Sequence, residues 1–351
     1  MKKFAFLPLA ALLMLASCKS DDPTPRPEVP TDPVATVPSQ ADDVTLNAPE
    51  QYPDYELDGS LYRFTYANGQ QISYTLTTDA TQGNVARVRK IAGASEVIIP
   101  SVVNTKAAST GEPLQYKVVC LDLFLDTAEG VVSLTLPKTA VAGYDNSALS
   151  EVNGAWFRRQ LEMLPDLEKI ELESGFPKFC SIDGAIYSAD YKTLVGVPRA
   201  AKGVFTIAED TQVVAEHAFY YCNSITAITF PAGVNEIQAG AVTFNDMLVL
   251  INMMPETAPK TAEDAFGEMA RTGLLRIPSG SYDSYFPVKP EVEAPVAPTE
   301  PAYDAPDEEW EQYDILLAEY ETAKAEYDAV MAEYENPAGF RDFTNVEQVN
   351  F

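Results

Sequence analysis

Few residues in this chain are of the kinds that perform covalent or metal chemistry, and they lie far apart. Any nucleophilic device built on histidine would have to use His217, the only histidine among 351 residues. Cys120, Cys180 and Cys222 are widely spaced, with no Cys-x-x-Cys pair and no histidine cluster. They therefore predict buried unpaired thiols rather than a zinc site or a disulfide framework. The 52 acidic residues are too many for a catalytic carboxylate pair to be picked out by spacing. We predict no catalytic residue, no cofactor and no metal site.

A fourth cysteine, Cys18, follows a short apolar run at the start of the chain. Two lysines precede thirteen apolar residues at 4–16, fewer than the ~20 that span a bilayer as a helix. A charged start, a short apolar stretch and small residues predict a cleavable signal peptide over residues 1–17. The sequence Leu-Ala-Ser-Cys at 15–18 resembles the lipobox of bacterial lipoproteins, which implies that Cys18 becomes the acylated first residue. The alternative is an ordinary secretory signal with a cysteine there by chance.

The residues after Cys18 predict a tether. Residues 19–22 read Lys-Ser-Asp-Asp, which resembles the acidic export signal of Bacteroidetes lipoproteins and implies display on the outer face of the outer membrane. Eight prolines and little apolar periodicity follow between residues 21 and 53. Such a segment buries too little surface to fold, and proline keeps it extended. We therefore expect residues 18–57 to form a flexible tether between the membrane and the folded part.

The net charge of −28, from 52 acidic and 24 basic residues, limits the partners of the protein. Nucleic acid is excluded, because its binding rests mainly on lysine and arginine at the phosphates. The partners are then neutral, cationic or apolar, unless the charge serves only to keep the protein soluble.

Short apolar strands recur every 23 or 24 residues, which predicts a solenoid. These strands end at Ala208, Pro231, Pro255 and Pro278. A second landmark keeps the same spacing, because Ala-Phe or Ala-Val pairs stand at 218–219, 241–242 and 265–266. One such unit cannot bury its apolar face alone, so neighbouring units must stack into a continuous core.

The alternation within each strand predicts which side chains face that core. In the unit ending at Pro231, Ile225, Ile228 and Phe230 are expected to point inward. The same phase gives an outward face, the candidate ligand-binding surface, formed by the pairs Ser133/Thr135, Lys169/Glu171, Val204/Thr206, Ala227/Thr229, Leu250/Asn252 and Leu274/Arg276. Their mixed small, polar and aliphatic character indicates a broad surface for a protein or a glycan. The alternative for any one of these residues is an inert face.

The earlier units are longer than the later ones. Strands at 97–100 and 134–137 are 37 residues apart, a helical stretch is expected at 150–164, and residues 183–198 predict a hairpin carried by one coil. At the front, residues 61–66 and 71–76 flank Asn68 and Gly69, the strongest short hairpin signal. We expect this hairpin to cap the open end of a solenoid that occupies residues 58–286.

The unit over residues 205–231 resembles the BspA-like (treponemal-type) leucine-rich repeat found in surface lipoproteins of Bacteroidetes. It follows that family's pattern of apolar-x-x-Ala-Phe-x-x-Cys-x-x-Leu-x-x-Ile-x-Ile-Pro through Ala218, Phe219, Cys222 and Pro231. Three positions depart from the pattern: Val242 replaces phenylalanine, Asn245 replaces cysteine and Ala208 replaces proline. The resemblance implies an irregular leucine-rich-repeat solenoid, mainly β with short helices, displayed at the cell surface. Some members of the family adhere to host or bacterial ligands, so the resemblance also implies adhesion. It supplies no catalytic residue.

An insertion interrupts the repeat at residues 287–336. Residues 287–306 hold six prolines, and a helix is predicted over 307–335 with tyrosines at 313, 320, 327 and 334. Polyproline rises ~3.1 Å per residue and a helix ~1.5 Å, so residues 287–301 span ~43 Å and the helix ~42 Å. The matching lengths predict a projecting polyproline–helix hairpin, with tyrosines facing prolines, that returns residues 337–351 to close the solenoid. The alternatives are a helix lying flat on the solenoid and a coiled coil with a partner.

Two functions from different classes are compatible with this sequence. The first is a non-enzymatic cell-surface lipoprotein that binds or adheres to a protein or glycan through the outward face. The second is a structural or accessory subunit of a surface complex, which docks a partner through the acidic helix at 307–335.

The anchor is tested directly by Cys18→Ala. Because acylation needs the thiol, this variant is expected to leave the membrane fraction, whereas the parent protein stays with it. Protease added to intact cells is expected to trim the parent protein. A variant that still partitions with membranes would refute the lipoprotein assignment, and full protection would place the protein in the periplasm.

Overall fold

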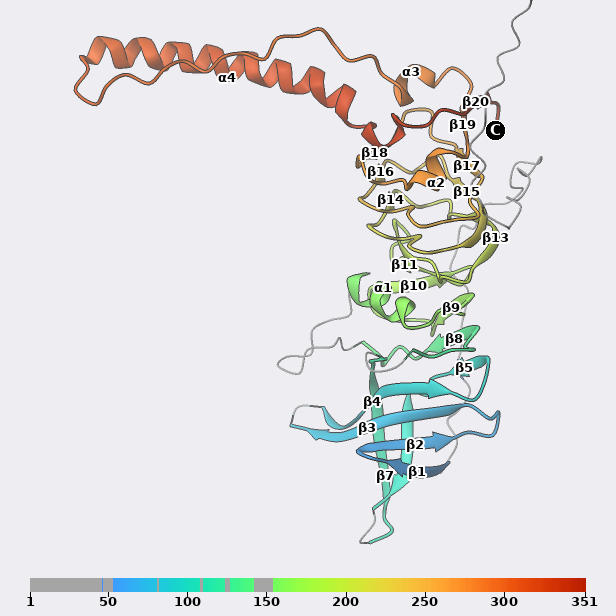
Figure 1. The fold of residues 1–351 in the computed structure, drawn as a ribbon. Coiled ribbons are helices and arrows are strands. Elements are labelled where there is room, and N and C mark those ends of the chain that lie inside the picture. Colours follow the sequence, from blue (N-terminus) through green and yellow to red (C-terminus); the bar gives the residue numbers. More distant parts are fainter. Residues whose placement is uncertain (1–45, 47–52, 81, 108–109, 124–126, 142–153) are drawn as a thin grey trace, which may run out of the picture.

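Successive coils of the chain stack into a column with parallel strands along its sides (Figure 1). The computed structural model describes residue 46 and residues 53–351, except 81, 108–109, 124–126 and 142–153. The signal peptide, Cys18 and most of the tether lie outside the described residues. In the described part, no helix is both long and apolar enough to cross a membrane.

The later coils each contribute one strand to a five-stranded parallel sheet. In spatial order its strands are β13 (Lys202–Thr206), β15 (Ser224–Phe230), β17 (Leu250–Met253), β19 (Leu274–Pro278) and β20 (Val346–Val349). The pairing register moves by one repeat at each step, as from Thr206 to Thr229 and from Thr229 to Asn252. This pairing confirms the solenoid that the 23- and 24-residue period predicts.

A second sheet runs along another side of the same coils. Its strands are β10 (Phe179–Ile182), β11 (Ala185–Ser188), β12 (Thr193–Gly196), β14 (Val213–Val214), β16 (Glu236–Ile237) and β18 (Lys260–Thr261). β11 and β12 pair antiparallel as the predicted hairpin, β10 pairs antiparallel with β11 as an additional strand, and the other pairs are parallel. Each later coil is therefore fixed to its neighbours on two sides.

The core lies between these two sheets and is continuous from coil to coil. Ile225, Ile228 and Phe230 are completely buried in it, which confirms their predicted inward orientation. The second landmark of the repeat is also buried, at Ala218, Phe219, Ala241, Val242, Ala265 and Phe266. Both sets of regularly spaced residues, those of the strands and those of the second landmark, therefore belong to the core.

Asn245 replaces the cysteine of the repeat pattern, and its side chain bonds to backbone carbonyl oxygens of the preceding coil, as the cysteine does. In one coil the buried thiol of Cys222 points at the carbonyl oxygens of Val197 and Pro198, each 3.7 Å away. In the next coil the Nδ2 of Asn245 donates to the carbonyl oxygens of Phe219 and Cys222, at 2.9 and 3.4 Å. The amide thus satisfies carbonyls of the preceding coil as the thiol does, so the substitution leaves the stack intact.

The early coils form a separate three-stranded parallel sheet of β5 (Glu96–Ile98), β8 (Ser133–Leu136) and β9 (Lys169–Leu172). The predicted helix is present as α1 (Gly154–Glu162), which buries Trp156 and Phe157. The 37-residue step has a simple cause, because the chain between β5 and β8 leaves the coil to supply two strands to the cap.

The cap at the first end is a six-stranded sheet, larger than the predicted hairpin. Its spatial order is β1 (Asp54–Asp58), β2 (Leu61–Thr65), β3 (Gln71–Asp79), β4 (Gly83–Ala92), β7 (Pro113–Leu121) and β6 (Val102–Lys106). The predicted hairpin is β2–β3, with its turn around Asn68 and Gly69. Residues 54–57, which the sequence assigns to the tether, pair with β2 instead, so the folded part begins before residue 58.

The other end of the column is closed by the last residues of the chain. The short helices α2 (Glu268–Arg271) and α3 (Tyr282–Tyr285) flank β19, and η1 (Ala338–Phe340) leads into β20. Phe340 is completely buried, with its ring 5.3 Å from Phe266 and 5.0 Å from Tyr285. Residues separated by the whole insertion therefore complete one coil, as expected.

The insertion projects from this end as an arm (Figure 1). The helix α4 (Asp307–Glu335) has the predicted bounds and no fully buried side chain. Its half-buried residues are Trp310, Tyr313, Leu317, Tyr320, Tyr327, Met331 and Tyr334. The prolines at 287, 290, 295, 298 and 301 are likewise half-buried, and most of the residues between them are exposed. The proline segment runs along the helix, which confirms the predicted hairpin and excludes a helix lying flat on the solenoid.

The base of the arm is fixed to the column at the end of α4. The guanidinium of Arg341 donates to the Tyr334 carbonyl oxygen at 2.8 Å and lies 4.1 Å from the centre of the Tyr334 ring. The amide of Thr261 in β18 donates to the Asn336 carbonyl oxygen at 2.6 Å. These contacts satisfy carbonyls that the helix end leaves free.

The strand phase is tested by comparing Phe230→Ala with Thr229→Ala. Loss of the buried Phe230 ring is expected to lower the free energy of unfolding by ~3–5 kcal/mol. From the sequence, Thr229 should matter little, but it is 3% exposed and accepts a hydrogen bond from Asn252 Nδ2 at 3.1 Å. We therefore expect Thr229→Ala to cost ~1 kcal/mol in urea unfolding. Equal losses for the two variants would show that the predicted strand phase is wrong.

Candidate functional site

The predicted outward face is brought together as two rows of side chains on the five-stranded sheet. The strand register aligns Thr206, Thr229, Asn252 and Arg276 in one row. It aligns Val204, Ala227, Leu250 and Leu274 in the other. None of these eight belongs to the core clusters, whereas the alternate residues do. One row is therefore polar, the other is aliphatic, and both point away from the core.

Facing away from the core does not make all of these residues accessible, which corrects the sequence prediction. Ala227, Thr229, Leu250 and Asn252 on the inner strands β15 and β17 are at most 3% exposed. Val204 on the edge strand β13 is 44% exposed, and Leu274 and Arg276 are half-buried. The strands β15 and β17 are paired on both sides, so these residues have neighbouring strands on either side, and Asn252 is further held by its hydrogen bond to Thr229. The accessible part of this face therefore lies toward its edges.

The early coils carry the remaining predicted residues in two shorter rows. Ser133 pairs with Lys169, and Thr135 pairs with Glu171. Ser133 on the central strand is buried, which again corrects the prediction, while Thr135 and Glu171 are half-buried and Lys169 is exposed. Glu96 and Ile98 of β5 extend these rows, and the sequence interpretation missed them. Their strand was recognised, and continuing the same phase by one strand would have found them.

The outward face is interrupted between β9 and β13, because these two strands do not pair. The turn of the β10–β11 hairpin lies against β9 instead, and the Ile170 amide donates to the Gly184 carbonyl oxygen at 2.9 Å. The turn consists of Asp183 and Gly184, with φ of 47° and 76°, the combination that two-residue hairpins require. A Cβ on Gly184 would lie 2.5 Å from the Cβ of Lys169, so only glycine allows this close approach.

The interruption leaves a groove of about 490 Å³ between β9 and β13. Its lining comprises Val132, Glu168, Lys169, Asp183, Pro198, Ala201, Lys202, Val204, Phe205 and Thr206. Three of these, Lys169, Val204 and Thr206, are predicted face residues. The side chains of Glu168 and Lys202 form an ion pair that links the two walls. The groove thus combines aliphatic and aromatic surface with charged groups, the mixture that ligand sites usually contain.

The sequence interpretation also missed several polar residues of this face. Lys202 and Asp183 line the groove, and Glu347 on β20 pairs with Arg276 at 2.8 Å. Lys202 begins a recognised strand but precedes the alternating pair, and Asp183 belongs to a recognised hairpin. Their meeting depends on how that hairpin docks on a neighbouring coil, which no local pattern encodes.

The histidine and the described cysteines have different surroundings, because His217 is exposed whereas Cys120 and Cys222 are buried and Cys180 is half-buried. His217 lies with its Nδ1 3.9 Å from the Glu216 carboxylate and its ring 5.0 Å from that of Tyr220. Burial raises the pKa of the Cys120 and Cys222 thiols to about 12, and that of Cys180 to about 11. Such thiols are protonated at neutral pH, and the thiolate is the nucleophile. Among the described residues, no group of three histidine, cysteine, aspartate or glutamate side chains is arranged to hold a metal ion.

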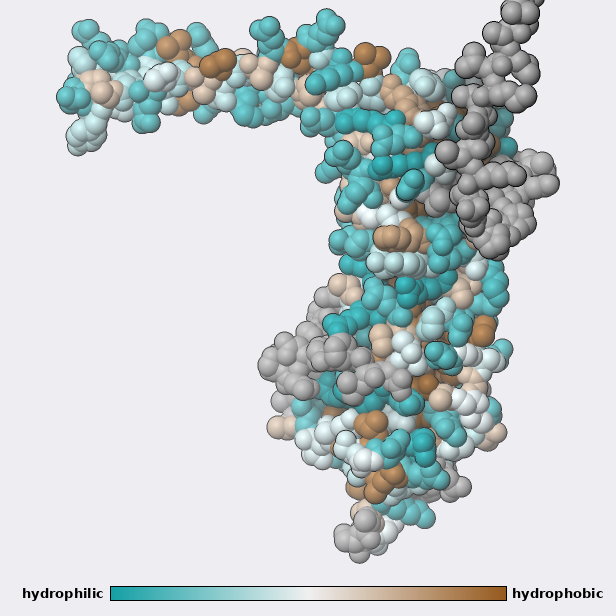
Figure 2. All heavy atoms as spheres, in the orientation of Figure 1, coloured by the Kyte–Doolittle hydropathy of each residue, from teal (hydrophilic) through white to brown (hydrophobic). Residues whose placement is uncertain are grey.

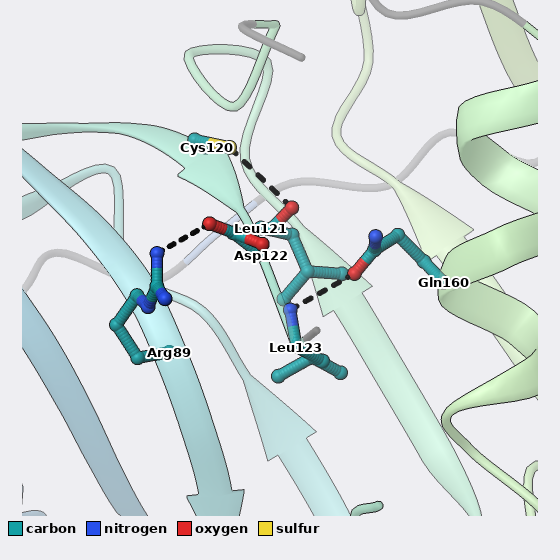
Figure 3. Close-up of polar contacts among 6 residues, drawn as sticks. All are labelled: Arg89, Cys120, Leu121, Asp122, Leu123 and Gln160. Carbon is teal, nitrogen blue, oxygen red and sulfur yellow. Dashed lines mark hydrogen bonds and ion pairs between the residues drawn. The ribbon is translucent and has the colours of Figure 1, made fainter. Parts of the chain in front are cut away.

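Cys120 stands beside a polar junction that joins the cap to the first coils (Figure 3). Arg89 of β4 forms an ion pair of 2.5 Å with Asp122, whose side chain is only 4% exposed. One residue further, the Leu123 amide donates to the Oε1 of Gln160 in α1 at 3.1 Å. The junction therefore ties β4, the end of β7 and α1 together. Asp122 Oδ1 and Arg89 Nε find no hydrogen-bond partner in the described part of the chain.

Comparison with known proteins gives structural likeness only. No family model matches the chain, and no curated protein matches it significantly. A leucine-rich repeat protein from Eubacterium ventriosum shares 15% identity over 52% of this chain and 47% of its own, with a TM-score of 0.31. A leucine-rich cell surface protein from Faecalibacterium prausnitzii shares 14% identity over 65% of this chain and 89% of its own, with a TM-score of 0.27. A leucine-rich repeat protein from Bacteroides ovatus shares 17% identity over 59% of this chain and 48% of its own, with a TM-score of 0.30.

The chain thus spans about half the length of the first of these structures. Values this low support no transfer of function. The solenoid architecture stands on the strand pairing and the buried repeat positions of this chain, and membership of the BspA-like family stays a prediction from its sequence.

The polar junction is tested by breaking one side of the ion pair. Arg89→Ala leaves the Asp122 carboxylate buried without a cation, which is expected to lower the free energy of unfolding by ~3–5 kcal/mol. Replacing both residues, as Arg89→Met with Asp122→Leu, is expected to recover most of that loss, because no uncompensated charge remains. If Arg89→Ala unfolds at the same urea concentration as the parent, the pair does not hold the cap to the column.

Proposed function

We propose that this protein is a non-enzymatic, lipid-anchored binding module of the bacterial cell surface, and that it holds a protein or glycan ligand in the groove between β9 and β13. The groove is the observation that carries the proposal. It lies where the outward face is interrupted, and it brings three predicted face residues together with charged groups. Anchoring at Cys18 and surface display are supported by the sequence features at the start of the chain.

The strand on one wall of the groove favours an extended polypeptide as the ligand. β13 is the edge strand of its sheet and pairs with β15 on one side only. An edge strand presents backbone donors and acceptors to which an extended segment can add. Val204 and Lys202 on this strand are exposed and would contact the alternate side chains of such a segment.

The alternative role is docking of a partner through the arm. It would use surface of α4 other than the tyrosine stripe. The tyrosines of α4 are half-buried, and the proline segment runs along the helix (Figure 1), so the tyrosine stripe is only partly accessible to a partner. The helix also exposes Ile315, Leu316 and Val330 by 56, 43 and 42%. Hydrophilic residues cover most of the visible arm surface around single hydrophobic ones (Figure 2). A docking partner would therefore meet an acidic surface with a few aliphatic contacts.

The groove is tested with the full chain carrying Cys18→Ala, applied to an array of glycans and surface proteins. Lys169→Glu with Lys202→Glu reverses two charges at the groove and is expected to abolish binding to the ligand found. Lys260→Glu is the matched control, because Lys260 is exposed on the other sheet. Urea unfolding midpoints equal to that of the parent would show that both variants are folded.

Three other outcomes would redirect the proposal. Binding that survives the groove variant would place the site elsewhere. Binding that is lost only when residues 288–335 are replaced by a short Gly-Ser linker would favour docking through the arm. Release of a chemically altered product by the parent protein would contradict the non-enzymatic role.

A further inference from the structure

A cluster of stacked aromatic rings lies on a flank of the column that is separate from the groove. Tyr220 and Tyr221 belong to the loop between β14 and β15, and Phe244 belongs to the equivalent loop one coil later. The rings of Tyr221 and Phe244 are parallel, with centroids 4.7 Å apart and planes 7° from each other. Tyr220 sets its edge against both, at 4.6 and 5.4 Å.

The backbone at these positions is one that aromatic residues rarely adopt. Tyr221 and Phe244 have φ of 59° and 56°, and His217 nearby has 56°. Glycine is favoured in this left-handed region, and it does occupy the position equivalent to His217 in the next coil, Gly240 at 58°. Bulky residues in such backbone are found where the side chain has a use that outweighs the strain. The stack explains part of that use, but it leaves one ring uncovered.

The uncovered ring is Phe244, which is 52% exposed. Val242 and Phe266 of the following coil form an isolated parallel β-bridge. Counting two residues on from this pair, the residue in register with Phe244 is Glu268. There the chain enters α2 and supplies no further ring to the stack. One face of Phe244 therefore ends the stack as a flat apolar surface in contact with solvent.

The opposite end of the stack carries a guanidinium. The Cζ of Arg199 lies 4.7 Å from the centre of the Tyr221 ring, and its Nη1 donates to the Glu162 carbonyl oxygen at 3.4 Å. Arg199 forms no ion pair with a carboxylate in the described part of the chain, although the chain carries 52 acidic residues. Arg158, Glu162 and His217 line the shallow cleft beside it, and Glu216 lies within 4 Å of Arg158 and His217, so Arg199 is the cation of this cleft that is not already paired with a described carboxylate. A fixed guanidinium without a carboxylate partner is suited to bind an anionic group in bidentate fashion.

We propose that this flank binds an acidic oligosaccharide, an anionic partner that the net charge of −28 does not favour but that the guanidinium of Arg199 can hold locally. The apolar face of one sugar ring would pack on Phe244, and the carboxylate of another would be held by Arg199 at the far end of the stack. The two features lie at opposite ends, which favours a ligand of several sugar units over a single one. A flat ring with polar groups around it fits a sugar better than an extended peptide, which would use the free strand edge at the groove. The proposal shares no residue with the groove, so either can fail without the other.

The test measures binding of galacturonic acid tetramers to the full chain carrying Cys18→Ala, by calorimetry, with the neutral glucose tetramer cellotetraose as reference. The parent is expected to bind the acidic tetramer and to bind the neutral one at least about tenfold more weakly, since a charge-assisted hydrogen bond contributes about that factor. Phe244→Ala and Arg199→Gln are each expected to weaken acidic binding by about tenfold or more. Arg199→Lys, which keeps the charge without the planar fork, is expected to recover only part of it.

Two variants serve as matched controls. Tyr282→Ala removes another exposed ring, 45% accessible and stacked at 4.9 Å on Phe286, and it is expected to leave binding unchanged. Arg63→Gln removes an arginine that already pairs with Glu56 in the cap, and the same is expected. Urea midpoints show whether Phe244→Ala still folds, and Phe244→Leu, which keeps apolar bulk without a flat ring, covers the case in which it does not. The proposal is overturned if the parent does not bind the acidic tetramer, if it binds the neutral one equally, or if Phe244→Leu binds as the parent does.

Discussion

The fold depends on the contact between the apolar faces of successive coils. No single coil encloses a core, and side chains such as Ile228 and Phe230 are buried only because neighbouring coils cover them. A stack of this kind has two ends at which a coil would expose its apolar face. In this chain the six-stranded cap closes one end, and η1 with β20 closes the other. The Arg89–Asp122 junction and the buried Phe340 are therefore both consequences of the same requirement.

The projecting arm is understood in the same terms. The closing coil needs residues on both sides of the insertion, because Tyr285 and Phe340 pack against each other across it. An insertion at this place must return the chain to where it left, and an extended segment beside a helix of equal length does so. The prolines at 287, 290, 295, 298 and 301 and the tyrosines of α4 are half-buried although the arm projects from the column, so the two segments of the arm shield part of each other's surface. The arm can therefore project without disturbing the column, and its acidic exterior stays in solvent.

Local periodicity predicted the features that depend on neighbours in the chain. The strand phase, the buried Ala-Phe landmark and the bounds of α4 all follow from alternation or spacing within one segment. Features set by pairing between distant segments escaped it. The cap recruits β6 and β7 from inside the first long coil, and the groove exists because the turn at Asp183 and Gly184 docks on β9. Position on the outward face was predicted, but burial of Ala227 and Asn252 depends on their flanking strands. The aromatic stack was missed because Tyr221 and Phe244 do not disturb the spacing of the repeat. Only their left-handed backbone distinguishes them, and the sequence does not show it.

Hydrogen exchange along the column under native conditions would examine most directly whether the coils form one closed, cooperative stack. Amides of β13, β15, β17 and β19 are expected to exchange with the same free energy of opening, because each strand is covered by the next. Those of α4 are expected to exchange sooner, since the helix contributes no buried side chain to the core. Exchange of β19 and β20 long before β13 and β15 would contradict closure of the stack by the returning end of the chain.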